Sequence, residues 1–365
     1  MTGPEIGIER QTSIATPYEI WQKSEAIPVI NGYYIEDLKT VHLEPWPGKG
    51  GLGAFVNLEG TGDADDAYVC EIPPGESLKP QKCMFEEVVF VLTGRGATNI
   101  WTDGGNKQTF EWQEGSIFSP PLNTWRQHFN GQGNKAVRFL VVTTAPLILN
   151  LFRSVDFAFN NNYIFKDRYD ARRDYFSSEG KTLDMGMGKI WESNFIPDAY
   201  SFNLPDRPER GLGAKIIKFA MASNTLGIHI SEFPIGMYKK AHRHGPGAHV
   251  VILSGEGYSL LWPEGKPKQK VDWHEGSMLV PPDFWFHQHF NTGNKPAKYM
   301  AVTWGNAKYG INYRVSMVRH SAALESAKSG GNQIEYGDEE PEIREIFESE
   351  LKRKGLESKM PRVKH

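Results

Sequence analysis

The amino-acid sequence predicts an all-β protein made of two copies of one double-sheet domain. Short alternating segments, such as residues 87–92 and 137–143, are separated by turns rich in Gly, Pro and Asn. The 365 residues include 37 glycines and 23 prolines and few strongly helical stretches. Four sequence blocks also recur in one register. Many short strands at this spacing are typical of a sandwich or a barrel-like double sheet.

The repeat is visible as matching blocks that lie 161 residues apart. One example is Trp-Arg-Gln-His-Phe-Asn at 125–130, which returns as Phe-His-Gln-His-Phe-Asn at 286–291. The other pairs of blocks are 69–75 with 230–236, 94–96 with 255–257, and 112–116 with 273–277. Because chance does not hold one register across four blocks, the chain carries a duplicated domain.

The repeat divides the chain into five parts. We expect an arm at 1–50, an N-terminal domain at 51–149, a linker at 150–205, a C-terminal domain at 206–306 and an extension at 307–365. The arm is expected to pack against a domain or a neighbouring subunit.

Three short helices are expected outside the strands. One begins at Pro17 with Thr16 as its cap, and one lies near residues 169–175 in the linker. The third runs from Pro341 to Gly355, with apolar positions at helical spacing and acidic residues ahead of basic ones. Its apolar residues are Ile343, Ile346, Phe347 and Leu351.

Composition excludes several classes of function. The net charge of −3 suggests neither a nucleic acid nor an anionic membrane as partner. No apolar run approaches the roughly 18 residues of a membrane span, and the first residues lack the pattern of a signal peptide. Cys70 and Cys83 are the only cysteines, which is no disulfide framework. We therefore expect a cytoplasmic protein.

Histidines cluster in the second repeat, where seven of the 11 lie between His229 and His289. Imidazole is the commonest protein ligand of transition metals. Residues two apart on a strand share a face, so His242 and His244 can face one metal ion, with His287 arriving from another strand. Three imidazoles leave coordination positions open for substrate. The alternative is three hydrogen-bonded interior histidines.

The spacing of these residues resembles the two sequence motifs of the cupin superfamily. Gly236 lies six positions before His242 of the His-x-His pair. The second motif is matched by Gly276, Pro282, His287 and Asn291, with Phe284 where a glycine usually stands. The resemblance covers both repeats. It implies a bicupin, with two double-stranded β-helix (jelly-roll) barrels and short N- and C-terminal helical arms.

The fourth ligand position departs from most metal-binding cupins, which carry a glutamate after the His-x-His pair. The first repeat has Glu87 there, and the second has Ala248. In this the second repeat resembles the gentisate 1,2-dioxygenase group of bicupins, which binds iron(II) through three histidines. His249 is the other candidate for a fourth ligand, although strand alternation turns it away from the face of Ala248.

That resemblance implies a mononuclear non-heme iron(II) dioxygenase of aromatic compound degradation. Its substrate would be a hydroxylated aromatic acid, cleaved with dioxygen, and the protein would be a homodimer or homotetramer. The gentisate dioxygenases usually have their working site in the N-terminal cupin, so gentisate itself is not the favoured substrate here.

The first repeat offers Gln81, Cys83, Glu87 and Arg126 at the four ligand positions. Arginine stays protonated and cannot ligate a metal. A thiolate–carboxylate site from Cys83 and Glu87 is the alternative to a domain without metal. We interpret this domain as a structural duplicate.

Three further residues are candidates for catalysis. His289 is expected to face the metal cavity as an acid/base or as a donor to bound substrate. Its counterpart His128, in the repeat without metal ligands, argues for a structural role. Tyr258 and Trp262 are candidates for an aromatic wall, and ordinary core packing is the alternative for both.

Two other functions stay open at this point. One is a different metal-dependent cupin reaction, with manganese, nickel or zinc, such as a decarboxylase, isomerase or lyase. The other is a non-enzymatic binding bicupin. Imidazole ligation does not choose among these metals.

Overall fold

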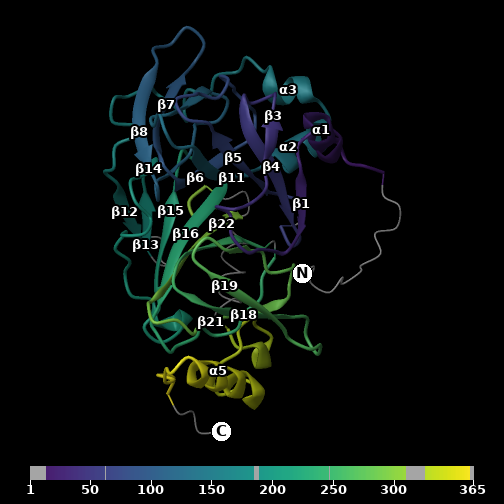
Figure 1. The fold of residues 1–365 in the computed structure, drawn as a ribbon, viewed down its shortest axis with the longest axis vertical. Helices are drawn as coiled ribbons and strands as arrows, with labels where there is room; N and C mark the ends of the chain where they lie inside the picture. The colour runs from purple at the N-terminus through teal and green to yellow at the C-terminus, as the bar shows by residue number, and fades with distance from the viewer. Residues whose placement is uncertain (1–13, 62, 185–188, 246, 310–324, 362–365) are drawn as a thin grey trace.

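The computed structural model describes residues 14–61, 63–184, 189–245, 247–309 and 325–361. Two domains of facing β-sheets follow one another along the chain, and helices lie at the periphery (Figure 1). The all-β prediction is confirmed.

The N-terminal domain has an eight-stranded sheet facing a three-stranded one. Across the large sheet the order is β1 (Val29–Gly32), β4 (Gly51–Leu58), β5 (Asp66–Ile72), β11 (Val137–Thr143), β6 (Glu87–Thr93), β9 (Ile117–Phe118) and β14 (Phe195–Ile196), with β3 (Glu44–Trp46) on β4. The small sheet has the order β10 (Trp125–Asn130), β7 (Arg95–Trp101) and β8 (Gln108–Gln113).

The C-terminal domain repeats this arrangement. Its large sheet has the order β12 (Lys181–Asp184), β13 (Lys189–Glu192), β15 (Lys215–Ala220), β16 (Leu226–Phe233), β22 (Ala297–Trp304), β17 (His249–Ser254), β20 (Met278–Leu279) and β2 (Tyr34–Ile35). The small sheet has the order β19 (Gln269–His274), β18 (Glu256–Trp262) and β21 (Phe286–Asn291).

The two domains share one strand order, which is that of a jelly roll. β16, β22, β17 and β20 form one sheet, and β21, β18 and β19 form the other. Residues 238–242 add a further edge to β21 through bridges at Tyr238–Phe290 and His242–His287. The strands from β7 to β10 recur as β18 to β21, each 161 residues later. The prediction of two double-stranded β-helix domains is confirmed.

The two large sheets pack against each other. One apolar cluster draws residues from both, for example Val69 and Leu140 from the first domain and Ile228 and Val302 from the second. Each large sheet also takes an edge strand from outside its own repeat. β2, from the N-terminal arm, pairs with β20, and β14, from the linker, pairs with β9. The arm thus bridges both domains.

Helices lie outside the sheets. They are α1 (Pro17–Glu25), α2 (Ala145–Phe152), α3 (Val155–Phe159) and α5 (Pro341–Arg353), with 3-10 turns η1 (Pro208–Arg210) and η2 (Ala327–Ser329). The predicted start at Pro17 is confirmed, because the Thr16 hydroxyl accepts from the backbone N–H of Glu19 in a capping box. No helix of the described residues is long and apolar enough to cross a membrane.

The prediction of a helix near residues 169–175 is wrong. This segment forms turns, and Ala171 has a φ of 54°, in the left-handed region that a helix excludes. Tyr169 and Tyr175 instead pack their rings with Ile100. Tertiary packing of the two rings therefore outweighs the local helical pattern.

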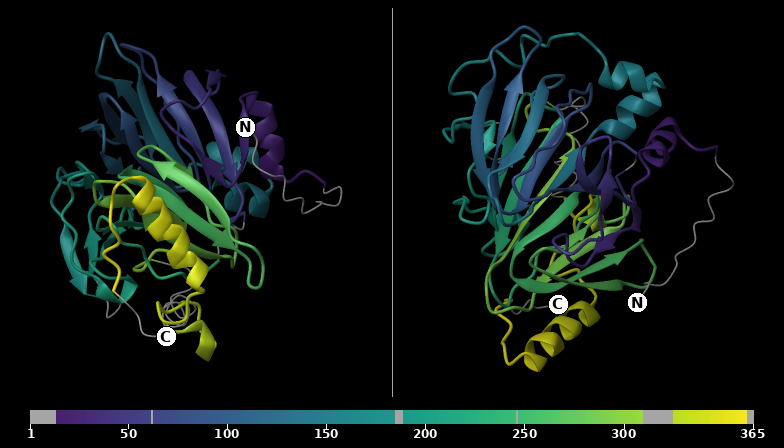
Figure 2. Two further views of the ribbon diagram at one scale, coloured as in Figure 1. Left: turned by 60° about the horizontal axis from the view of Figure 1, so that its bottom comes forward. Right: turned by 45° about the horizontal axis from the view of Figure 1, so that its top comes forward.

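The helix α5 covers the outer face of the C-terminal small sheet (Figure 2). Its buried residues are Ile343, Phe347 and Leu351, one turn apart, and Ile346 is partly buried beside them. The consequence shows in β21, where every residue is buried, whereas the matching β10 alternates between buried and partly exposed. Both faces of the C-terminal small sheet are therefore covered along β18 and β21, whereas β19 at its edge keeps alternate residues exposed.

A buried carboxylate joins the linker and the two domains. Glu86 is 6% exposed, and its oxygens accept from the backbone N–H groups of Thr225 (2.8 Å) and Leu226 (3.1 Å) at the start of β16. They also accept from the Thr225 hydroxyl (2.7 Å) and from the guanidinium of Arg168 in the linker (3.0 Å).

We predict that Glu86→Ala lowers the free energy of unfolding by about 3 kcal/mol, because it leaves buried N–H donors and a guanidinium without their acceptor. Urea denaturation followed by fluorescence measures the change. Glu111→Ala, on the exposed side of β8, is the matched control and should stay within about 0.5 kcal/mol of the unmodified protein. Equal stability of the two variants would contradict the role of Glu86.

Candidate metal centre

The segment that carries the first two predicted ligands lies between β16 and β17, outside the regular strands, and is held from both sides. On one side, His242 and His287 exchange backbone hydrogen bonds of 3.1 and 2.9 Å. On the other side lies the C-terminal extension, where the Ile334 N–H donates to Ala241 (2.8 Å) and the Arg243 N–H donates to Asn332 (2.9 Å). The backbone of this segment is thereby fixed before any metal binds.

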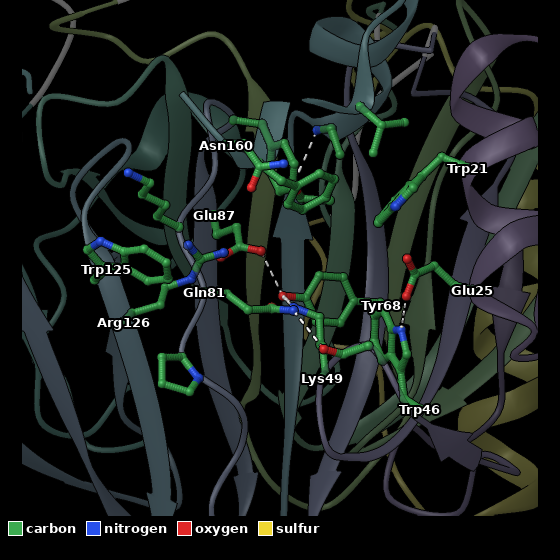
Figure 3. Close-up of a pocket in the computed structure, with 18 residues that line it drawn as sticks. Trp21, Glu25, Trp46, Lys49, Tyr68, Gln81, Glu87, Trp125, Arg126 and Asn160 are labelled. Atoms are coloured by element: carbon green, nitrogen blue, oxygen red, sulfur yellow. Dashed lines mark hydrogen bonds and ion pairs between the residues drawn. The ribbon is translucent and has the colours of Figure 1, made fainter. Parts of the chain in front are cut away.

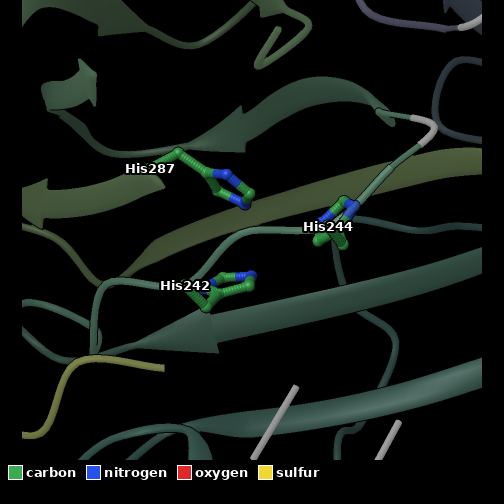
Figure 4. A group of neighbouring side chains, drawn as sticks. All are labelled: His242, His244 and His287. Carbon is green, nitrogen blue, oxygen red and sulfur yellow. The ribbon is translucent and has the colours of Figure 1, made fainter. Parts of the chain in front are cut away.

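The three predicted ligands come together. Ligating atoms of His242, His244 and His287 all lie within 4.8 Å of one another, as one metal ion requires (Figure 4). Their ring centroids are 5.6 Å (His242–His244), 4.3 Å (His242–His287) and 4.9 Å (His244–His287) apart. Among the described residues, no other group of His, Cys, Asp or Glu meets this geometry.

Backbone carbonyls orient two of the rings. Nδ1 of His242 lies 3.3 Å from the carbonyl oxygen of Lys240, and Nδ1 of His287 lies 3.2 Å from that of Trp285. A carbonyl can only accept, so each Nδ1 carries the proton and Nε2 keeps its lone pair for a metal. Burial, then nearby charge, holds the pKa of both imidazoles well below 6.5. The donor set fits a divalent transition metal.

His289 lies beside the three ligands and faces the same interior. Its ring centroid is 5.8 Å from that of His287. Nδ1 lies 2.7 Å from the Ser259 hydroxyl, which accepts from the indole N–H of Trp273 at 3.0 Å. The hydroxyl can then donate to Nδ1, which leaves the proton of His289 on Nε2. Burial, followed by the charge of Lys239, lowers the pKa of His289 to about 3.

The same arrangement exists in the first domain. The Thr98 hydroxyl lies 2.8 Å from Nδ1 of His128 and accepts from the indole N–H of Trp112 at 2.8 Å. A hydroxyl–histidine–tryptophan set therefore recurs where no histidine ligands exist, so part of its role is structural.

Neither Ala248, at the position of the missing glutamate, nor the neighbouring His249 adds a ligand to the three histidines. Ala248 points into the apolar interior and packs with Leu261 and Ala301. His249 is fully buried and points toward Asp65 of the first domain, with Nδ1 3.3 Å from its carboxylate. His249 does not join the group of three histidines.

The structure does not bring Tyr258 and Trp262 to the metal centre. In β18 the side chain of Ser259 points to His289, so its neighbours at even positions point the other way. Tyr258 stacks on Phe290 with centroids 4.5 Å apart, and Trp262 stacks on Phe286. Both belong to the apolar cluster beneath α5. Their packing is that of core residues.

Sequence reasoning missed three polar residues near the histidines. The buried ammonium of Lys239 donates to the hydroxyls of Ser231 (2.5 Å) and Tyr299 (2.8 Å). The ring of Tyr299 lies 5.4 Å from that of His289. Arg210, in η1, contributes to lowering the pKa of His242 and His287. Its Nη1 is buried without a hydrogen-bond partner among the described residues.

Phe284, which stands where the motif usually has a glycine, keeps the backbone conformation that favours glycine. Its φ is 57°, in the left-handed region where the usual glycine carries no penalty. The residue at the matching position of the first repeat, Asn123, has a φ of 55°. Both domains thus keep the same turn before the third ligand position, at the cost of backbone strain at Phe284.

An ion pair occupies the ligand positions of the first domain. Arg126 and Glu87, 5% and 3% exposed, form a buried salt bridge. Nη2 of Arg126 also lies 3.1 Å from Sγ of Cys83. Burial raises the pKa of the Cys83 thiol to about 11, so the thiol stays protonated near neutral pH. The guanidinium supplies the positive charge here, and these residues do not suit a metal.

Five histidines that are largely shielded from water predict acid sensitivity. Burial is the main cause that lowers the pKa of His128, His229, His242, His287 and His289. The unfolded chain protonates these groups near pH 6.5 and the folded chain does not, so stability should fall as the pH drops below about 6.5. Each histidine contributes up to about 1.4 kcal/mol per pH unit. Glu339, whose pKa burial raises to about 7, acts in the opposite direction.

Urea denaturation of chelator-treated protein between about pH 7.5 and about pH 5.5 measures this slope. His128→Asn, which removes one of the five groups in the domain without metal ligands, should give a shallower slope. A free energy of unfolding that does not change over this range would contradict the assignment.

Comparisons with known proteins add little to this geometry. No protein-family model and no curated protein matches the chain. Among solved structures, a deletion variant of Bacillus subtilis oxalate decarboxylase OxdC is 13% identical, with a TM-score of 0.49 over 76% of this chain and 78% of that one. A structure used to assign the Mn(II) centres of the same enzyme is 12% identical, with a TM-score of 0.48 over the same shares. Likeness at this level says nothing about chemistry.

Proposed function

We propose that the chain is a metal-dependent enzyme that acts on a small organic anion in its C-terminal domain. The observation that carries the proposal is the convergence of His242, His244 and His287, with ligating atoms within 4.8 Å of one another. Membership of the gentisate 1,2-dioxygenase group, suggested by the His-x-His segment, stays a prediction.

A metal held by three neutral imidazoles keeps its full double positive charge. When bound, it supplies a Lewis acid with open positions for a chelating substrate. Iron(II) is the prediction from the sequence resemblance. The ligand set does not favour iron over manganese, nickel or zinc, because imidazole accepts all four.

Cations near the three histidines support an anionic substrate. Lys239 is 3% exposed, and within the described residues its ammonium donates to two hydroxyls rather than to a carboxylate. Arg210 adds a second positive charge, with a buried N–H that lacks an acceptor. Buried cations are costly without a counter-charge, and a bound carboxylate would supply one. Substrate binding thus balances the charge of the site.

Two side chains support proton transfer as part of this proposal. His289 presents its Nε2–H to the interior, where it can donate to a substrate oxygen. Burial raises the pKa of Tyr299, but the charge of Lys239 and hydrogen bonds from Lys239 and Ser231 outweigh burial and lower it overall. A phenol of lowered pKa is a better proton donor at neutral pH.

Two reaction types fit such a site. In the first, a hydroxylated aromatic acid is cleaved with dioxygen, as the sequence resemblance implies, and Ala248 in place of a glutamate supports it. In the second, a carboxylic acid is decarboxylated, isomerised or cleaved without oxygen. Oxygen uptake with hydroxylated aromatic acids, compared with anaerobic turnover of the same acids and of dicarboxylates, distinguishes the two.

We expect His244→Ala to lose at least about 90% of the bound metal and of any turnover, since two imidazoles alone hold divalent ions weakly. Metal analysis of protein purified without added metal gives the first value. His274→Ala is the matched control, because His274 is exposed on β19 away from the three ligands. Normal metal content in His244→Ala would refute the centre. Protein that neither carries nor takes up metal would favour the non-enzymatic binding function.

Arg210→Met should raise the KM for an anionic substrate by about 10- to 100-fold and leave the metal content unchanged, because it removes a charged donor while keeping the ligands. Arg353→Met, at an exposed pair with Glu350, is the control and should leave KM unchanged. An unaltered KM in Arg210→Met would show that Arg210 does not bind the substrate.

A further inference from the structure

The N-terminal domain has a cavity at the positions that correspond to the metal ligands of the C-terminal domain. It has a volume of about 360 Å³, and Gln81, Glu87 and Arg126 are part of its lining (Figure 3). This size lies at the lower end of the range for small-molecule sites. The floor is buried, whereas Gly48, Pro80 and Asn160 at the rim are exposed, so a ligand can enter.

Aromatic rings form much of the wall, and they come from separate parts of the chain. α1 contributes Trp21, and the segment with β3 contributes Trp46. β10 contributes Trp125, which is partly exposed and stacks on Trp101 at an angle of 10°. Helices α1 and α3, which lie outside the jelly roll, thus help to build the pocket. Such walls suit a planar apolar body.

A continuous polar network forms the base of the pocket. Lys49 donates to the hydroxyl of Tyr68 (3.0 Å), which donates to Glu87 (2.7 Å), and Glu87 pairs with Arg126 (Figure 3). Lys49 also donates to the amide oxygen of Gln81 (3.0 Å). These contacts give the Glu87 carboxylate its hydrogen-bond donors and a counter-charge. They also hold the Lys49 ammonium in place while using only two of its three N–H groups.

Among the charged residues that line the pocket, Lys49 has no carboxylate partner within the described residues. Of the other cations, Arg126 pairs with Glu87, and Lys82 pairs with Asp103 at 3.0 Å. Glu25 accepts from the indole N–H of Trp46 at 2.6 Å. Lys49, in contrast, has only neutral acceptors within the described residues, and its ammonium lies 4.5 Å from the ring centroid of Tyr68. One of its three N–H donors is left for a ligand.

We propose that this pocket is a second binding site, which takes a small aromatic carboxylate without using a metal. Lys49 binds the carboxylate, and the tryptophan-rich wall contacts the ring. The ion pair of Arg126 and Glu87, rather than a metal ion, forms the base of the site. The site is separate from the three-histidine centre, and its ligand is bound rather than transformed.

The test uses 4-bromobenzoate, whose bromine can be located by anomalous scattering in soaked crystals of the full chain. The bromine peak should lie in the pocket of the N-terminal domain. Calorimetry should show that 4-bromobenzoate binds at least about tenfold more tightly than the neutral 4-bromobenzyl alcohol, because the alcohol lacks the charge that pairs with Lys49.

Variants assign the binding to Lys49. Lys49→Met should weaken 4-bromobenzoate binding by at least about tenfold. Lys79→Met is the matched control, because Lys79 is an exposed lysine whose ammonium donates to the backbone of Pro47 outside the pocket. It should bind as the unmodified protein does. His244→Ala should also bind normally, which separates this site from the metal centre.

Three results would overturn the proposal. One is affinity in Lys49→Met within about twofold of the unmodified protein. Another is a bromine peak confined to the surroundings of His242, His244 and His287. The third is no detectable binding up to about 10 mM. As a second probe of the wall, Trp125→Ala should weaken binding while the thermal midpoint stays near that of the unmodified protein.

Discussion

The backbone pairing between residues 238–242 and β21 is the constraint on which the C-terminal site depends. It places His242 opposite His287, with reciprocal N–H to C=O bonds, and the carbonyls of Lys240 and Trp285 then orient the two rings. The sheet thus supplies both the position of the ligands and the tautomer that exposes Nε2. A metal binding there would meet ligands that are already ordered, and little conformational entropy is lost on binding.

The duplicated domain shows that one backbone can serve two different charge arrangements. In the C-terminal copy, three neutral imidazoles face an interior with Ala248 where a glutamate would stand. In the N-terminal copy, Arg126 and Glu87 satisfy each other at the same positions. The hydroxyl–histidine–tryptophan set behind both centres is unchanged. The residues at the ligand positions can therefore differ between the two domains, because the hydrogen bonds that support them are present in both.

Much of the fold and the ligand set could be predicted from the sequence, because both depend on local spacing. The strands of the second domain follow those of the first at the 161-residue spacing of the repeat, and the His-x-His pair brings two imidazoles together with His287. Tyr258 and Trp262 could not be assigned, because their side of β18 is decided by the contact of Ser259 with His289 and by coverage from α5. Lys239 and Arg210 were missed because only the folded chain brings them to the histidines. The turns at 169–175 follow from ring packing that no local pattern shows.

The exchange of edge strands has a consequence for synthesis on the ribosome. β2 emerges early, but its partner β20 lies more than 240 residues later, so the two strands can pair only after the chain has been made as far as Leu279. β14 likewise completes the first domain only after the linker has been made. Contacts between such distant residues are slow to form. The first domain can collapse while it is nascent, yet the arm reaches its final pairing only after most of the second domain has been made.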